Sequence, residues 1–488
     1  MNYQLNDEPL ATVASDAVVG FVFENSNDAP ASIDSWDALT GGLVAELFAS
    51  GEFKGHQHSC ARLHRPSGMA ANQLVLIGCG PKEKFSSAVL RECAGVAGRL
   101  LRTAGSRNIA IQPPDPSGVQ AIVEGFSAAL YEPDSYITSD RAELSIESVA
   151  VLAGAAQQAA LDRALAVAAG QRFACELANE PGNILPPCEL AERTAAMAEQ
   201  AGLECEILDE DRLNELEMGS LLGVAMGSVE PPVMIVLRYV PEQPNSNSDI
   251  HLGLVGKAVT FDTGGISIKP SADMGLMKYD MAGGAAMIGA MQAIAALKPS
   301  IPVTAVIPSV ENMPGAAALR PGDVLTSMSG TTIEVLNTDA EGRLILADAL
   351  SYARQLGCTH LVDAATLTGA VVVALGHENS GVFTNDAEWQ ERVLRCAAAA
   401  GEKMWPMPLD DAYSALLKSP IADLANIGPR WGGAITAAAF LKHFADPAPW
   451  VHLDIAGTGW YEENKPFAAK GPSGVAVRTL VELAMSTS

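Results

Sequence analysis

The stretch Val255–Pro270 carries three charged side chains, Lys257, Asp262 and Lys269, among residues that are mostly apolar or small. Such surroundings solvate charge poorly, and a buried lone carboxylate is costly, so a charge there needs a counter-ion or a metal ion. The stretch follows an apparent strand, His251–Val255. Its charges therefore indicate a functional site at the end of that strand.

A second stretch of this kind, Asn337–Leu344, contains Asp339 and Glu341, two positions apart. In an extended backbone, residues i and i+2 project to the same side, so both carboxylates are predicted to face one pocket. The helical spacing of Leu346 and Ala349 begins directly afterwards. The pair is therefore predicted to lie at a turn from strand to helix.

Asp280 immediately precedes a predicted helix of small residues, Met281–Leu297. A negative charge at a helix N-terminus is favoured by the helix dipole, so Asp280 fits either a plain helix cap or a ligand of the same site. The sequence alone leaves both interpretations open.

Oxygen-rich ligand sets suit Mg, Mn or Zn, and several bridging carboxylates suit two ions about 3.5–4 Å apart. None of the eight histidines lies in an H-E-x-x-H motif, which excludes a mononuclear zinc protease of that type. A competing metal cluster is His56, His58 and Cys60, which alternation would place on one strand face; an ordinary polar strand face is the alternative.

Gly256-Lys257 is not part of a phosphate-binding P-loop. Ala258 stands where that motif needs Ser or Thr, and His251 stands where its first glycine belongs.

Short β-branched runs alternate with longer alanine-rich stretches, which predicts an α/β fold. In the first third, strands are expected at 17–23 and 73–77 and a helix at 88–103. A long helix is expected at 151–178, ending at the prolines and glycine of 181–187. We therefore expect a smaller N-terminal α/β domain (1–150), a linker helix (151–180) and a larger catalytic domain (181–488). Its central mixed sheet, flanked by helices, would use strands at 233–239, 251–255, 303–308, 360–364 and 450–455.

The chain has 488 residues, 31 Lys and Arg against 57 Asp and Glu, and a net charge of −26. This acidity repels phosphate backbones and disfavours general nucleic-acid binding. The eight cysteines form no C-x-x-C pair, which indicates free thiols. The acidic start Met1–Glu8 is not that of a secretory signal, and no run of about 18 apolar residues suggests a membrane span. We expect a cytoplasmic protein.

At these motifs the sequence resembles the leucyl (cytosol) aminopeptidase family. The matching segments are Val255–Lys269, Met277–Met281, Arg320–Val324, Asn337–Leu344, Asp363–Gly369, Gly432–Ala434 and His452–Gly457. Their order and approximate spacing agree across the C-terminal region, and the octapeptide Asn337–Leu344 is highly specific. The N-terminal third matches only loosely.

The resemblance implies a metal-dependent aminopeptidase with two divalent ions in each subunit, Mn or Zn or Mg. Asp262, Asp339 and Glu341 would serve or bridge both ions, with Asp280 and Lys257 completing the shell of one. All five residues match the family pattern.

By the same resemblance, Lys269 and Arg343 would be the catalytic pair. Lys269 would donate to the developing oxyanion, and Arg343 would hold a bicarbonate ion that acts as general base. Peptides with N-terminal leucine or other apolar residues are the expected substrates, and a homohexamer is the expected assembly. The implied substrate-binding residues are Lys269, Met277, Asn337, Thr366, Leu367, Gly369 and Ala456.

Two other function classes fit the sequence less well. Some relatives also bind DNA, which the strong acidity argues against. A two-metal hydrolase acting on phosphate esters would be expected to gather more cationic groups than Lys269 and Arg343.

Overall fold

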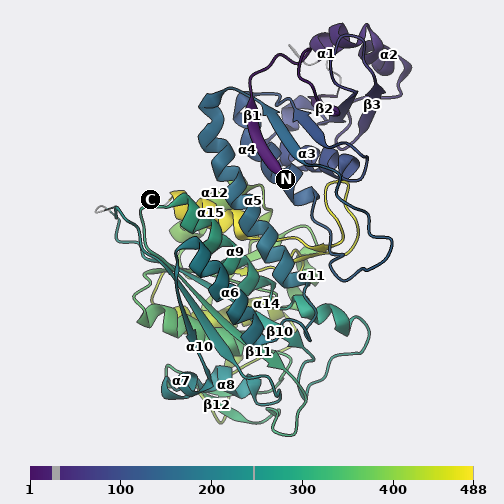
Figure 1. The fold of residues 1–488 in the computed structure, drawn as a ribbon. Coiled ribbons are helices and arrows are strands. Elements are labelled where there is room, and N and C mark those ends of the chain that lie inside the picture. The colour runs from purple at the N-terminus through teal and green to yellow at the C-terminus, as the bar shows by residue number, and fades with distance from the viewer. Residues whose placement is uncertain (25–32, 246–247, 487–488) are drawn as a thin grey trace. The chain divides into compact units, whose positions relative to one another are not determined.

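The computed structural model describes residues 1–24, 33–245 and 248–486 (Figure 1) and divides into two compact units. The first unit comprises residues 1–168 and 462–470, and the second comprises residues 169–461 and 471–488. The division falls inside one helix, α5 (Gln158–Asn179). The domain limits at 150 and 180 stay a prediction.

Within the described residues, the first unit is built on a six-stranded sheet whose neighbours are parallel except β3 and β4. Its strands, from edge to edge, are β1 (Asn2–Asn6), β6 (Ser148–Leu152), β5 (Asn108–Ile111), β2 (Ala17–Val22), β4 (Gln73–Gly78) and β3 (Cys60–His64). Its helices are α1 (Ile33–Thr40), α2 (Leu43–Ser50), α3 (Ser87–Leu101) and α4 (Val119–Ala129), with 3-10 turns Lys82–Lys84, Pro116–Gly118 and Ala155–Gln157.

Alternate residues of β2 show why both faces of this sheet are covered. Val19 and Phe21 belong to the core shared with α3 and α4, whereas Val18 and Val22 pack with Trp36 of α1. Every residue of β2 is buried, as expected for a strand with helices on both sides.

The segment 462–470, far along the chain, belongs to the first unit. Its Phe467 packs against the α3–α4 core and lies 5.5 Å from His58 between ring centroids. A Cβ on Gly95 of α3 would lie only 2.8 Å from the Phe467 Cβ, so glycine provides the space for this ring to approach the helix.

The predicted helix at 151–178 was wrong at its start. Val151 and Leu152 end strand β6, which pairs with β1 and β5, and α5 begins only at Gln158. The β-branched Val149 and Val151 are buried between neighbouring strands, and Gly154 separates the strand from the helix.

In the part of the chain described, the second unit contains a nine-stranded mixed sheet. Its strands run in the order β16 (Met404–Pro406), β15 (Ser380–Thr384), β18 (Trp450–Asp454), β14 (His360–Ala365), β9 (Leu252–Gly256), β11 (Val303–Asn312), β8 (Val233–Tyr239) and β7 (Glu204–Leu208), and β10 (Ala258–Asp262) also pairs with β11. The parallel strands β18, β14, β9 and β11 form the centre.

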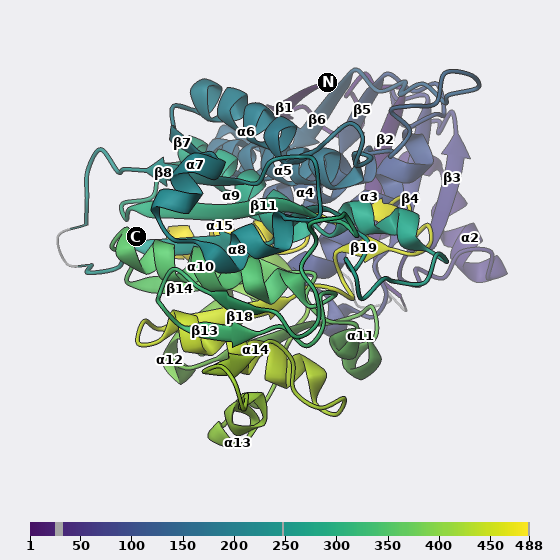
Figure 2. The ribbon, with the colours of Figure 1, turned by 90° about the horizontal axis from the view of Figure 1, so that it is seen from below.

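Two helices that matter for the site, α9 (Ala282–Leu297) and α10 (Glu341–Gln355), pack on opposite faces of the central strands (Figure 2). The remaining helices of this unit are α6 (Pro187–Ala201), α7 (Glu210–Glu215), α8 (Gly219–Ala225), α11 (Gly369–Leu375), α12 (Ala387–Ala400), α13 (Asp411–Ser414), α14 (Gly433–Ala445) and α15 (Val477–Ser486), with 3-10 helices η5 (Met274–Tyr279) and Ala415–Leu417. Small sheets join β12 (Val324–Thr326), β13 (Thr332–Glu334) and β17 (Leu424–Ala425), and β19 (Trp460–Tyr461) with β20 (Gly471–Pro472).

One helical stretch of the described chain, Met274–Leu297, is long and apolar enough to cross a membrane, but 83% of its most apolar window is buried inside the fold. A helix this deeply buried is a core helix, and the many small residues of α9 allow its close packing. The predicted fold class, a smaller N-terminal α/β domain and a larger domain with a mixed sheet between helices, is confirmed.

Candidate active site

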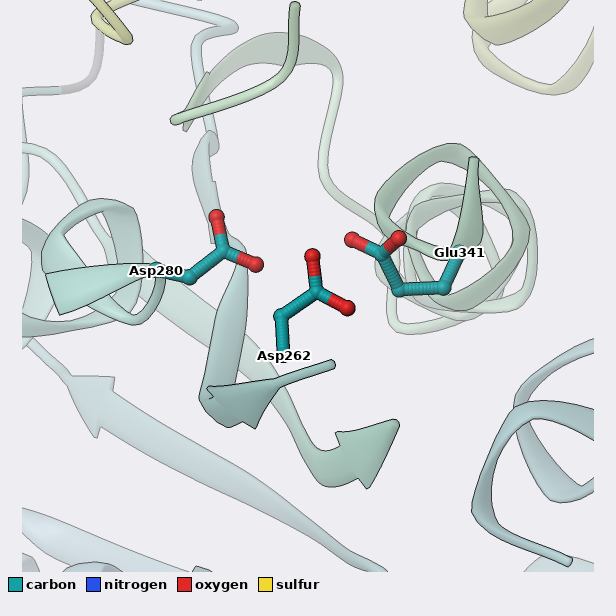
Figure 3. Close-up of side chains that lie close together, drawn as sticks. All are labelled: Asp262, Asp280 and Glu341. Carbon is teal, nitrogen blue, oxygen red and sulfur yellow. The ribbon is translucent and has the colours of Figure 1, made fainter. Parts of the chain in front are cut away.

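Three carboxylates from separate elements point toward one another in the second unit (Figure 3). Asp262 is the last residue of β10, Glu341 is the first residue of α10, and Asp280 lies between η5 and α9. The three side chains are buried. Within the described residues, they form the one group of three or more His, Cys, Asp or Glu whose ligand atoms lie within 4.8 Å of one another.

The donor atoms of this acidic cluster, defined as Asp262, Asp280 and Glu341, fit a metal ion. Oδ2 of Asp280 and Oε2 of Glu341 are buried and accept no hydrogen bond within the described part of the protein. Buried carboxylate oxygens without a donor are costly unless a cation satisfies them. An all-oxygen set of this kind suits Mg, Mn or Zn.

Lys257 lies in the middle of this cluster. Its Nζ is 2.7 Å from Oδ1 of Asp280, 2.8 Å from Oε1 of Glu341 and 3.0 Å from the carbonyl oxygen of Thr366. A Cβ on Gly342 would lie 2.7 Å from the Lys257 Cε, so glycine at position 342 lets the lysine side chain pass close to the start of α10. Asp280 also accepts a hydrogen bond from the Thr366 hydroxyl (2.6 Å), so it is not a plain helix cap.

Lys269 contacts carboxylates from both predicted stretches, Val255–Pro270 and Asn337–Leu344. Its Nζ lies 2.7 Å from Oδ2 of Asp262 and 2.5 Å from Oδ1 of Asp339. The extended backbone predicted for Asp339 and Glu341 is wrong, because Asp339 lies in a turn after β13 and Glu341 already begins α10. The predicted turn before a helix is confirmed, and both carboxylates still reach a lysine of the site.

Burial shifts the ionisation of these groups. Burial raises the pKa of Asp280 to about 8 and that of Asp262 to about 6, although the neighbouring lysines partly oppose it. Burial opposes the charge of Lys257, but the carboxylates around it outweigh that effect and raise its pKa. Burial also disfavours the charge of Glu341, but Lys257 and Lys269 outweigh it and hold its pKa below the ordinary value. The four carboxylates around the two lysines therefore leave buried negative charge that a further cation would neutralise.

Arg343 lies on the first turn of α10, two residues after Glu341. Its Nη1 donates to the carbonyl oxygen of Asn426 (2.9 Å), while its buried Nε has no acceptor within the described residues. Burial lowers the pKa of the guanidinium to about 10, although Glu341 and Asp454 oppose this shift. An arginine held by one edge with a donor to spare can bind a planar anion.

Two asparagines that support these side chains were missed from the sequence. Asn312, at the end of β11, donates to Oδ1 of Asp262 (2.8 Å) and to the carbonyl oxygen of Thr338 (3.0 Å). Asn426 donates to the carbonyl oxygen of Asn337 (2.7 Å). Asn312 follows a predicted strand, which is the only signal that could have found it; Asn426 lies in a loop with no such signal.

The predicted substrate-binding residues come from several loops, from η5 and from the start of α11. Thr366 contacts Lys257 and Asp280, and Leu367 follows it. The carbonyl oxygen of Met277 accepts from the Asp280 backbone (3.4 Å). The other members are Asn337, whose Oδ1 accepts from Asp339 N (2.9 Å), Gly369 at the start of α11, and Ala456, which follows β18.

The competing cluster of His56, His58 and Cys60 does not form. His56 Nδ1 pairs with Glu24 (3.0 Å) and His58 Nε2 pairs with Glu92 (2.9 Å). The predicted strand face is also wrong here, because both histidines lie in a turn and β3 begins only at Cys60.

The whole chain is similar to known proteins. The family described as "Cytosol aminopeptidase family, catalytic domain" matches residues 172–481, and "Cytosol aminopeptidase family, N-terminal domain" matches residues 18–140. A "Probable cytosol aminopeptidase" of Solibacter usitatus is 53% identical over 99% of both chains. One of the same name from Acidobacterium capsulatum is 46% identical over 98% of this chain and 96% of its own.

Solved structures of other proteins are also similar to this chain. A tomato leucine aminopeptidase mutant is 33% identical with a TM-score of 0.90, covering 100% of this chain and 96% of that one. The bottromycin maturation enzyme BotP in complex with Mn is 33% identical with a TM-score of 0.85, covering 97% and 99%. A buried acidic cluster and an Mn-containing structural neighbour together support a divalent metal ion.

Proposed function

The chain belongs to the cytosol aminopeptidase family and is an aminopeptidase that acts on peptides, and from this premise we propose that it preferentially releases N-terminal leucine and other apolar residues with the help of two divalent ions. The observation that carries the proposal is the convergence of Asp262, Asp280 and Glu341, buried and within 4.8 Å of one another.

We assign the five metal ligands as follows. Asp262, Asp339 and Glu341 would serve both ions, and Asp280 and Lys257 would complete the shell of one; Mn, Zn and Mg all suit this ligand set. When bound, the two ions supply a water of lowered pKa and polarise the substrate carbonyl. As a ligand Lys257 must be neutral, which costs at least about 4–5 kcal/mol from a reference pKa near 10.4 because the surrounding carboxylates raise its pKa further, and adjacent dications would offset that cost.

Lys269 is the proposed oxyanion donor. Its ammonium group stays charged because Asp262 and Asp339 pair with it, and burial does not overcome them: the pKa of Lys269 is raised. A charged donor fixed at the site stabilises negative charge on the carbonyl oxygen as a nucleophile attacks.

Arg343 is the proposed holder of a bicarbonate ion that acts as general base. Its contact with Asn426 fixes the guanidinium, and its buried Nε remains available as a donor. Arg343 would hold the anion beside the reacting groups, and a bicarbonate bound there would supply a general base.

One of the two ions, when bound, would also hold the free α-amino group of the substrate, which an internal peptide bond lacks. This explains the release of single residues from the N-terminus. The side chain of the released residue would lie among Met277, Thr366, Leu367, Gly369 and Ala456, with Asn337 nearby.

The cellular location and the assembly of the protein are also part of this proposal. The names of the relatives support a cytoplasmic location. The family resemblance supports a homohexamer, which sedimentation of the purified protein at several concentrations would test.

The function is tested by removing metal with a chelator and adding back Mn, Zn or Mg separately. Leucine anilide should be cleaved only after metal is restored, and its N-acetylated form should resist cleavage throughout. Equal activity before and after metal restoration, or cleavage of the acetylated substrate at the same rate, would overturn the proposal.

A further inference from the structure

Asp454, the last residue of β18, connects two loops of the proposed substrate pocket. Its Oδ1 accepts hydrogen bonds from Leu367 N (3.2 Å), Thr368 N (3.4 Å) and Ala456 N (3.2 Å). Its Oδ2 accepts from the Thr368 hydroxyl (2.7 Å). One fully buried carboxylate therefore joins residues that lie almost ninety positions apart in sequence.

The sheet explains this position. Strands β14 and β18 are parallel neighbours with Ala365 opposite Asp454, so the loops that follow them leave the same edge side by side. Each loop exposes backbone N–H groups that the sheet no longer pairs, and a carboxylate between them satisfies these donors together.

The same loop continues into the acidic cluster. Thr366, one residue before Leu367, accepts from Lys257 through its carbonyl oxygen (3.0 Å) and donates to Asp280 through its hydroxyl (2.6 Å). A shift of this loop would therefore change both the pocket and the groups beside it.

We propose that Asp454 is a positioning residue that holds the Thr366–Gly369 loop and Ala456 at the separation required for an apolar N-terminal side chain. This inference rests on the proposed function. The hydrogen bonds of Asp454 reach the pocket only through the backbone and through Thr368, so they set the shape of the pocket. Its charge also raises the pKa of the Arg343 guanidinium, so a shape effect must show as a change in the leucine-to-alanine ratio and not as an equal loss of kcat for both substrates.

The domain offers a matched control. Asp348 of α10 is equally buried and also accepts backbone hydrogen bonds, from Leu221 N and Met328 N (both 2.8 Å), at segments outside the proposed pocket. Asp348→Asn and Asp454→Asn make the same chemical change in buried carboxylates of this kind. A purely structural role predicts the same functional result for both.

The experiment compares leucine and alanine anilides in the metal-loaded enzyme. For Asp454→Asn we expect KM for the leucine substrate to rise about tenfold, with kcat and KM for the smaller alanine substrate changed by less than about threefold. Metal content should equal that of the wild type. Asp348→Asn should retain the wild-type ratio of kcat/KM for the two substrates.

If Asp454→Asn does not fold, two substitutions of Thr368 test the same hydrogen bond with a smaller change. Thr368→Val removes the hydroxyl that donates to Asp454, and Thr368→Ser keeps it. The valine variant should lose part of the preference for leucine, and the serine variant should retain it.

An unchanged ratio in Asp454→Asn, or in Thr368→Val where the first variant is unfolded, would overturn the inference. A wild-type enzyme without preference for leucine over alanine would overturn the proposed specificity, and this inference with it.

Discussion

The ammonium group of Lys257 lies 2.7 Å from the carboxylate of Asp280, and both side chains are buried. Buried charges of this kind depend on neighbouring charges and hydrogen bonds for their stabilisation, so removing one changes the balance of the others. The pair is also tied to Glu341, whose Oε1 lies 2.8 Å from Lys257. The behaviour of this site on mutation is therefore expected to depend on charge balance.

Asp280→Asn should reduce the metal content of the purified enzyme and lower kcat/KM by at least about a hundredfold, because it removes a charged ligand beside Lys257. Metal analysis and hydrolysis of leucine anilide measure both effects. Asp323→Asn is the control, because Asp323 pairs with Arg320 outside the cluster. An active Asp280→Asn enzyme with the metal content of the wild type would contradict the assignment of Asp280 as a metal ligand.

Arg343→Ala should lower kcat by about 10²- to 10⁴-fold with metal content intact, because it removes the anion-holding group and no ligand. The variant should also lose any response to added bicarbonate, which rate measurements in bicarbonate-free buffer can test. If both metals are lost instead, Arg343 is a structural residue of α10.

Lys269→Met should lower kcat by about 10²- to 10³-fold with a smaller change in KM, because the lost donor acts mainly on charge that develops during the reaction. Steady-state kinetics with leucine anilide provide the measurement. Lys298→Met, which removes an exposed lysine paired with Glu242, should behave as the wild type. A change confined to KM would argue against the oxyanion role.

The metal-free protein should become less stable as pH rises. Asp262 and Asp280 have folded-state pKa values of about 6 and about 8, above the ordinary 3.8, because burial disfavours their ionised forms. Their contribution to stability is complete below the ordinary pKa and is lost as pH rises through about 6 and about 8. Melting temperatures of chelator-treated protein should therefore fall across this range.

Two comparisons test whether this loss of stability comes from Asp262 and Asp280. Asp280→Asn should show a flatter pH dependence, and added Mn should raise the melting temperature of the wild type more at pH 8 than at pH 6. A metal-free melting temperature that rises toward pH 8 would refute the explanation.

The sequence predicts five strands of the sheet in the second unit, β8, β9, β11, β14 and β18, because each is a largely apolar run. The run at Val233–Tyr239 has the predicted bounds, and that at Trp450–Asp454 differs by one residue. The lysines and carboxylates of the site were identifiable because they interrupt such runs, where charge is costly.

The features that sequence reasoning missed depend on tertiary contacts. Val151 lies in an alanine-rich stretch that fits a helical pattern, but pairing with two strands decides its conformation. Asn426 and Asp454 act on backbone atoms of distant loops, and local periodicity carries no information about such partners.

The contribution of residues 462–470 to the first unit affects how the protein is made. On the ribosome, a nascent chain of the first 168 residues lacks Phe467, and the space beside Gly95 stays unfilled until the last portion of the polypeptide emerges. The first unit to be translated is therefore among the last to reach its final packing. Premature termination near the 3′ end of the message would leave both units incomplete.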